Sequence, residues 1–277
     1  MIKKLNEEKS KVNLILWISI LFEIIVIGIG IFLLVNQIYV IGISFLIIFN
    51  IPYICLMVLV SKRHKKIEKA YIAYIGKILS NADFIEKFES VKEVDTKEYK
   101  KLGIIPNYTG LKLKNNLSGT YENVEYDMYD AFATVTSGNS TSVVFSGRIY
   151  ELGLKNSHLH TIFTDNKYNR VKKMVKLPLE KNKIIKYVDG EIKDTITDLQ
   201  VYQFFKSIKR NEKSKITIKI TRNKVMVSIS RMDELFKYTY LKPLKDLNFL
   251  DLETKISNEL TNIIDNVKEL LDDYLEE

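Results

Sequence analysis

The sequence predicts an α+β protein in which an N-terminal two-helix transmembrane hairpin is followed by a cytoplasmic domain with an antiparallel sheet and a long C-terminal helix. Three patterns predict this fold class. Residues 14–60 are almost all apolar, residues 111–151 and 216–229 alternate between apolar and polar positions, and residues 252–274 carry an apolar stripe at helical spacing. A period of two is typical of strands, and apolar residues three and four apart are typical of helices.

The apolar stretch predicts the hairpin by its length. One bilayer-spanning helix needs about 20 residues, and residues 14–60 are about twice that. The polar pair Asn36 and Gln37 lies at the midpoint, which gives helices over residues 14–35 and 38–60. A cleaved signal peptide is the alternative, but its apolar core would be shorter and would end at small residues. We therefore expect the first helix to be retained.

Basic residues flank the hairpin on both sides and predict its orientation. Residues 1–13 form a basic N-terminus, and a second basic cluster follows residue 60. The turn between the helices carries no charge. The positive-inside rule therefore predicts a cell-membrane protein with two spans and both termini in the cytoplasm.

Glu23 is the one ionisable residue inside either span. A carboxylate in the bilayer is costly and needs a partner. If the turn lies between Asn36 and Gln37, two residues at the same depth in the membrane have numbers that add up to about 73. This places Glu23 level with Asn50 and Gly30 near Gly42. We expect Glu23 and Asn50 to share a hydrogen bond that locks the hairpin. An ion or proton site in an oligomer is the alternative.

Residues 61–98 are predicted as a helical juxtamembrane segment. Apolar residues recur at helical spacing as far as Leu79, residues 80–83 can break and recap the helix, and residues 84–88 suit a short second helix. The cytoplasmic domain is then expected to occupy residues 99–277.

Several local signals place the elements of that domain. Turns are expected at residues 115–116, 137–140 and 222–223, between alternating segments that read as strands, and residues 158–164 suit one more strand. Thr197 and Gln200 have the spacing of a capping box, which predicts a helix start there. The apolar stripe from Leu252 predicts the terminal helix, whose other face is acidic.

The order of these signals resembles the uncharacterised bacterial family known as domain of unknown function thirty-one thirty-seven. Residues 118–121 (Ser-Gly-Thr-Tyr), residues 145–150 (Phe-Ser-Gly-Arg-Ile-Tyr), the strand pair at 216–229 and residues 233–236 (Asp-Glu-Leu-Phe) carry the resemblance. It implies an integral membrane protein with a cytoplasmic mixed domain, and it brings no established activity or catalytic residues.

The sequence offers no catalytic site, metal site or cofactor motif. Nucleophile elbows, phosphate loops, dinucleotide fingerprints and Cys-x-x-Cys pairs do not occur, and Cys55 is the single cysteine. His158 and His160 would share one face of a strand, but no third metal ligand is near them. Asp127 and Asp130 fall on opposite faces of a strand. Asp130 lies in an apolar stretch, and we expect a buried ion pair with Arg148.

The formal charge of +8 is distributed unevenly, with a basic middle and an acidic C-terminal tail. Either compositional bias or attraction to an anionic leaflet can explain the basic middle. Nucleic acid is disfavoured because few aromatic residues interleave with the lysines. The residues that we predict to contact anionic lipid are Lys62, Arg63, Lys65, Lys66, Lys172, Lys173 and Lys176.

These observations favour a non-catalytic binding or scaffold module tethered at the membrane surface. Membrane lipid is the expected partner, a protein partner and oligomerisation stay open, and no cofactor is expected. A membrane-tethered enzyme that uses Asp130, Asp233 or the histidines is the first alternative. An oligomeric transport component built around Glu23 is the second.

Overall fold

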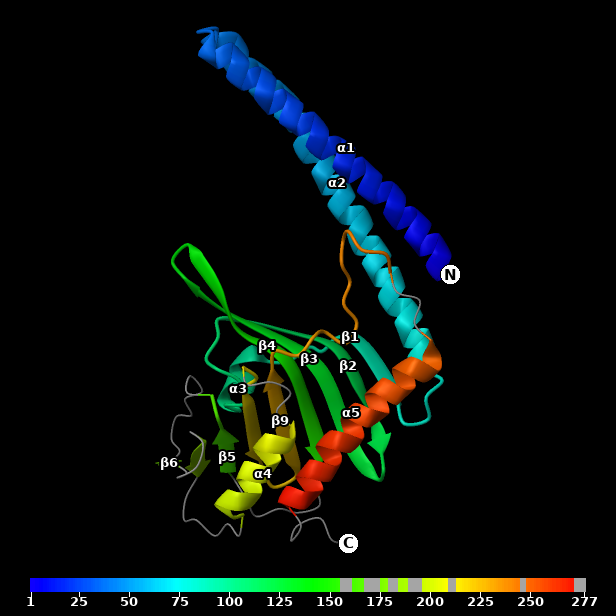
Figure 1. The fold of residues 1–277 in the computed structure, drawn as a ribbon, viewed down its shortest axis with the longest axis vertical. Helices are drawn as coiled ribbons and strands as arrows, with labels where there is room; N and C mark the ends of the chain where they lie inside the picture. Colours follow the sequence, from blue (N-terminus) through cyan, green and yellow to red (C-terminus); the bar gives the residue numbers. More distant parts are fainter. Residues whose placement is uncertain are drawn as a thin grey trace. The chain divides into compact units, whose positions relative to one another are not determined.

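Figure 1 shows the computed structural model of the chain, which describes residues 1–154, 161–166, 175–178, 184–188, 196–208, 213–244 and 248–271. The chain divides into two compact units. The helical unit contains Met1–Lys77 and Tyr238–Leu247, and the sheet unit contains Ile78–Lys237 and Asn248–Glu277. The expected boundary at residue 99 is therefore corrected in two ways. The sheet unit begins earlier, and a short segment after its last strand belongs with the helices.

The helical unit is built from two long helices, α1 (Ile2–Val35) and α2 (Tyr39–Leu79). The turn between them is tight because Gln37 adopts a left-handed conformation, with φ 63°. The basic N-terminus is the first part of α1, and α2 continues through Pro52 and past the expected span to Leu79. The structure thus confirms the predicted hairpin, and its helices are longer than the apolar segments.

The two helices approach each other through glycines that receive leucine side chains. A Cβ atom at Gly30 would lie 2.3 Å from Cδ2 of Leu46, and one at Gly42 would lie 3.1 Å from Cδ2 of Leu34. The expectation that Gly30 faces Gly42 is therefore wrong. A leucine fills the space opposite each glycine, because packing a large side chain against a small one leaves less void than two small ones.

The predicted contact between Glu23 and Asn50 is also corrected. Nδ2 of Asn50 donates to the carbonyl of Leu46 in its own helix, at 2.9 Å. Within the described helices α1 and α2, Oε2 of Glu23 is buried without a hydrogen-bond partner. An asparagine in a helix can bond the carbonyl four residues earlier, and that local partner replaces the one across the hairpin.

The sheet unit contains a nine-stranded sheet in the order β1-β2-β3-β4-β9-β8-β5-β7-β6, and all described pairings are antiparallel. The predicted fold class is therefore confirmed. The strands are β1 (Lys87–Val91), β2 (Gly110–Tyr121), β3 (Val124–Ser137), β4 (Ser140–Gly153), β5 (Thr161–Thr164), β6 (Val175–Pro178), β7 (Ile185–Val188), β8 (Ile216–Ile220) and β9 (Lys224–Ser230).

Two local predictions in this unit are wrong. The helical segment expected as far as residue 98 ends at Leu79, and residues expected to form a short helix contribute to β1 at the edge of the sheet, where pairing with β2 outweighs local helical spacing. Asn115 and Asn116 do not turn the chain but form a bulge inside β2, with Asn115 at φ 53°. Asparagine tolerates the left-handed conformation that such a bulge requires.

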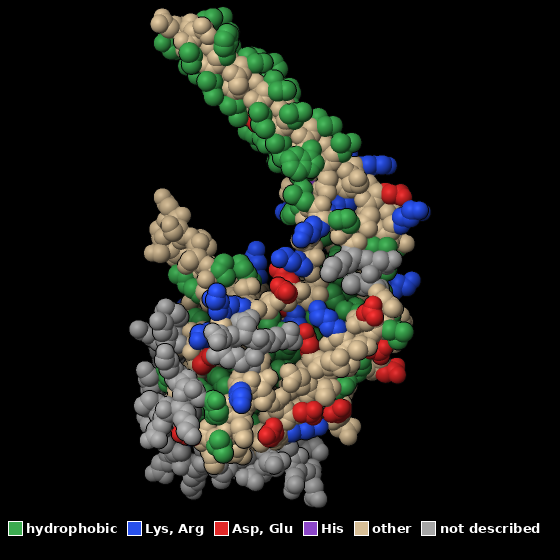
Figure 2. Space-filling view, in the orientation of Figure 1, with side chains coloured by type: hydrophobic (Ala, Val, Ile, Leu, Met, Phe, Trp, Pro, Cys, Tyr) green, Lys and Arg blue, Asp and Glu red, His purple; other side chains and the backbone are tan. Residues whose placement is uncertain are grey.

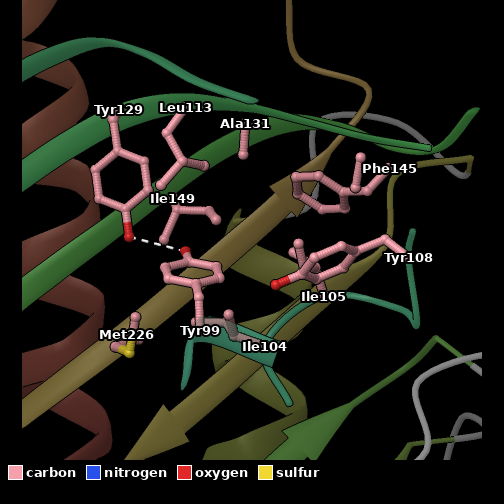
Figure 3. Packing of buried hydrophobic residues seen from close by; sticks show 11 residues of the cluster. Tyr99, Ile104, Ile105, Tyr108, Leu113, Tyr129, Ala131, Phe145, Ile149 and Met226 are labelled. Atoms are coloured by element: carbon pink, nitrogen blue, oxygen red, sulfur yellow. Dashed lines mark hydrogen bonds between the residues drawn. The ribbon is translucent and has the colours of Figure 1, made fainter. Parts of the chain in front are cut away.

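Helices cover both faces of the sheet (Figure 1). On one face lie α4 (Asp198–Ile208) and α5 (Phe249–Leu270), which pack side by side. The capping box at the start of α4 is confirmed, because the side chains of Thr197 and Gln200 each accept from the other's backbone N–H. On the other face, α3 (Thr96–Lys101) and the segment after it cover an apolar cluster that includes Tyr99, Tyr129 and Ile149 (Figure 3).

Candidate functional site

A buried ion network lies between the sheet and α5. Nε of Arg148 in β4 donates to Oδ1 of Asp130 in β3 at 3.0 Å, and Nη1 of Arg148 donates to Oε2 of Glu259 in α5. Arg148 is only 1% exposed. The structure therefore brings together the two residues of the expected ion pair. It adds a second carboxylate, so that one guanidinium joins two strands to the helix that covers them.

Backbone and amide groups complete this network. Oδ2 of Asp130 accepts from Nδ2 of Asn115 at 2.8 Å and from the backbone N–H of Leu235 at 2.7 Å, and Nη2 of Arg148 donates to the carbonyl of Asp233 at 2.9 Å. Asn115 is the bulged residue of β2, so the bulge serves to aim its side chain at Asp130. Both oxygens of Asp130 are thus engaged, which leaves this carboxylate poorly placed to act as a base.

The opposite face of the sheet carries a polar hollow of about 530 Å³. Asp127 and Glu151 are cross-strand neighbours there, and Lys224 lies 2.8 Å from Oε2 of Glu151. A buried chain of hydroxyls reaches the same carboxylate, from Tyr99 to Tyr129 and then to Glu151. Burial alone would raise the pKa of Glu151, but the nearby lysines and Tyr129 lower it overall. Glu151 is therefore a stable anion that holds two tyrosines in place.

The helical unit contains a polar clasp, which we define as Asn6, Lys9, Asn13 and His64 with the strap of residues 238–244. Lys9 is 2% exposed, and its ammonium donates to the carbonyls of Thr239 and Lys242 and lies 4.5 Å from the ring centre of Tyr238. Asn6 pairs reciprocally with the backbone of Leu244, and Asn13 donates to the carbonyl of Tyr240. The strap, which leads from β9 towards α5, is thus held on the hairpin by side chains of α1.

His64 of α2 completes the clasp and is fully buried. Its Nδ1 lies 2.9 Å from the hydroxyl of Tyr238, its ring packs against that of Tyr240 at 4.5 Å, and its Nε2 has no hydrogen-bond partner among the described residues. Burial and then the charge of Lys9 lower the pKa of His64. Burial raises the pKa of Tyr238 to about 12, so its hydroxyl keeps a proton to donate.

We expect the clasp to weaken in acid. The ionisable groups around His64 are Lys9 from α1, Tyr238 and Tyr240 from the strap, and Glu68 from α2, which acts on Tyr238. When the strap is open, His64 has its ordinary pKa of about 6.5, whereas closure lowers it, so the open state binds more protons in acid. His64 therefore contributes fully to closure above about pH 6.5 and progressively less below it.

The rate of amide hydrogen exchange of residues 238–244, corrected for the pH dependence of intrinsic exchange, tests whether the clasp weakens in acid. Exchange should accelerate as the pH falls through about 6.5 in the natural chain. It should stay level in a His64→Gln variant, which does not titrate there. Equal acceleration in both chains would assign the acid effect to another group.

The other predicted site residues fall in different parts of the chain. Lys62, Arg63, Lys65 and Lys66 are exposed on α2. Lys172 and Lys173 lie outside the described residues, as do His158, His160 and the side chain of Lys176. Asp233 contributes a backbone carbonyl to the ion network, and His64 belongs to the helical unit.

Sequence reasoning missed Glu259, Lys9 and the strap. Glu259 could have been found, because it continues the apolar stripe of α5, three residues after Ile256 and four before Ile263. An acid on a buried helix face needs a cation, and Arg148 is the one that meets it. Lys9 carried no comparable signal, because it is one of several lysines before the first span and its carbonyl partners lie more than 200 residues away.

Comparisons with known proteins give little that bears on function. No family model and no curated protein matches the chain. The crystal structure of the mycobacterial trehalose monomycolate transport factor A is similar over 70% of this chain and 92% of its own, with 10% identity and a TM-score of 0.41. A likeness this weak carries no argument about function. The resemblance to domain of unknown function thirty-one thirty-seven stays a prediction.

Proposed function

We propose that this chain is an integral membrane protein whose hairpin holds the sheet domain at the cytoplasmic surface, where the domain acts as a non-catalytic binding or scaffold module. The observation that carries the proposal is the exposure of the hairpin. The most apolar stretches of α1 and α2 are long enough to cross a membrane, yet only 17% and 6% of their residues are buried.

Such exposure argues against α1 and α2 being the buried core helices of a soluble protein. A helix that is apolar on all sides is stable only when protein or lipid surrounds it. Figure 2 shows apolar side chains over the half of the hairpin nearest the turn, and basic side chains gathered at the other end. The bilayer is therefore the surrounding that best accounts for residues 14–60.

The proposed orientation rests on the position of these basic residues. Exposed lysines lie at the start of α1, and the exposed cluster of α2 follows its span. The turn at Asn36 and Gln37 carries no charge. Each basic residue near an anionic surface contributes about 1 kcal/mol of attraction, which favours contact between this end of the hairpin and the cytoplasmic leaflet.

Cysteine labelling in intact cells tests the orientation. In a Cys55→Ala background, Asn36→Cys should react with a membrane-impermeant maleimide from outside, and Ser207→Cys in the sheet unit should react only after the membrane is broken. Both positions are exposed, so access is limited by the bilayer. Labelling of Ser207→Cys from outside would refute the cytoplasmic placement, and extraction of the chain by alkaline carbonate would refute the integral anchor.

A further inference from the structure

A small hollow of about 240 Å³ lies beside the buried ion network, within the sheet unit. The sheet contributes Lys112 and Lys114 of β2 and Phe132 of β3, and the segment after β9 contributes Met232 and Glu234. Leu113 points into the apolar cluster on the opposite face of the sheet. Alternation along the strand therefore directs Lys112 and Lys114 to the face that carries the hollow.

Lys112 and Lys114 have no counter-ion of their own among the described residues. Across the described part of the chain, neither Lys112 nor Lys114 forms an ion pair. Asp130 is the cross-strand neighbour of Lys114, but both of its oxygens are engaged by Arg148, Asn115 and the backbone of Leu235. Two like charges two residues apart on one strand face repel each other, and an anion between them would relieve this repulsion.

The remaining walls favour a cation next to that anion. Glu234 is exposed and supplies a carboxylate, and Phe132 is 38% exposed and supplies an aromatic ring. An ammonium group is attracted both to a carboxylate and to the face of an aromatic ring. The volume is smaller than the roughly 300–1,000 Å³ of sites for drug-sized ligands. A nucleotide is therefore too large, whereas a headgroup fits.

We propose that this hollow binds a phosphoethanolamine group, with the phosphate between Lys112 and Lys114 and the ammonium against Glu234 and Phe132. The group can be presented by a phospholipid or by a free small molecule. The lipid source rests on the proposed function, because it requires the hairpin to hold the domain at a bilayer. Binding of the free group does not depend on the membrane orientation.

The test uses the full chain in dodecyl maltoside micelles, which contain no phosphate. Soluble phosphoethanolamine should slow amide exchange of residues 110–114 and 231–236 at lower concentrations than inorganic phosphate does. A second arm uses nanodiscs of phosphatidylcholine with and without phosphatidylethanolamine. If phosphatidylethanolamine in nanodiscs slows exchange of these amides, the natural ligand is a lipid headgroup. If only soluble phosphoethanolamine in micelles slows it, the natural ligand is a free small molecule. Absence of protection in both arms, or equal protection by inorganic phosphate, overturns the proposal.

Variants separate a specific site from general attraction. Lys112→Gln/Lys114→Gln should raise the half-saturating concentration of phosphoethanolamine roughly tenfold or more, the equivalent of about 1.4 kcal/mol. Glu234→Gln should weaken the binding of phosphoethanolamine, because the ammonium loses its carboxylate partner. It should strengthen the binding of inorganic phosphate, because it removes a negative charge next to the anion. Lys206→Gln/Lys255→Gln, at two exposed lysines of α4 and α5, matches the change in charge and should have no effect.

Folding is not expected to confound these variants. Lys112 is exposed and Lys114 is half-buried, and neither pairs with a described acidic residue, so glutamine at either position breaks none of the ion pairs that the structure describes. Thermal unfolding of each variant in micelles verifies this. A loss of affinity in the control variant equal to that in Lys112→Gln/Lys114→Gln would overturn the site, because it would show that only the net charge matters.

Discussion

Replacement of Arg148 with methionine is expected to lower the free energy of unfolding of the sheet unit by roughly 3–5 kcal/mol, the usual cost of removing one partner from a buried ion pair. The guanidinium lies between Asp130 and Glu259, which are 5% and 7% exposed. Without Arg148, two carboxylates would be left in an apolar interior, and they would repel each other or take up protons. The carbonyl of Asp233 would lose its donor as well.

The matched control removes all three charges. A variant that combines Arg148→Met with Asp130→Asn and Glu259→Gln should recover most of the lost stability, because neutral amides of similar size leave no unpaired charge in the interior. Native-state amide exchange of β3 and β4 in the full chain measures both variants. If the triple variant is as unstable as Arg148→Met alone, the loss comes from packing and not from unpaired charge.

The second large effect is expected at Lys9. Lys9→Met should lower the free energy of opening of the strap by roughly 1.5–3 kcal/mol, because a hydrogen bond from a charged donor contributes about this much. The carbonyls of Thr239 and Lys242 lose their donor, and Tyr238 loses a cation over its ring. Methionine keeps a similar length and volume, so the change reports on charge and hydrogen bonding.

Lys11 provides the control for this experiment, since it is a lysine of the same helix that is exposed. Lys11→Met makes the same chemical change in the same part of the chain and should leave the strap closed. Amide exchange of residues 238–244 distinguishes the two variants. Equal opening in both would show that net charge near the membrane, and not the buried ammonium, holds the strap.

Much of the fold could be predicted because its signals are local. The length of the apolar stretch predicts two helices and a turn, and the alternation at residues 216–229 predicts β8 and β9. The capping box at Thr197 predicts the start of α4. Each of these signals depends on residues a few positions apart, whose local preferences agree with the final fold.

The candidate site was partly predictable for the same reason. Asp130 interrupts an apolar strand, so a buried cation was required, and Arg148 lies on the next strand of the meander. The hollow beside them was not predictable, because part of its wall comes from Met232 and Glu234, which lie about 100 residues beyond Asp130 in the chain. The expected bond between Glu23 and Asn50 failed because Asn50 has a closer acceptor in its own helix.

The hairpin, the antiparallel strands, the capped helix and the need for a buried partner to Asp130 can all be derived from the order of the residues. Three features emerge from the folded chain alone: Glu259 is the second carboxylate on Arg148, Asn115 bulges to reach Asp130, and Lys9 holds the strap of residues 238–244. These two groups of features differ in how far apart in the chain the interacting residues lie. Helices and strands follow from neighbouring residues, whereas buried charges are satisfied by whichever groups the fold brings within hydrogen-bonding distance.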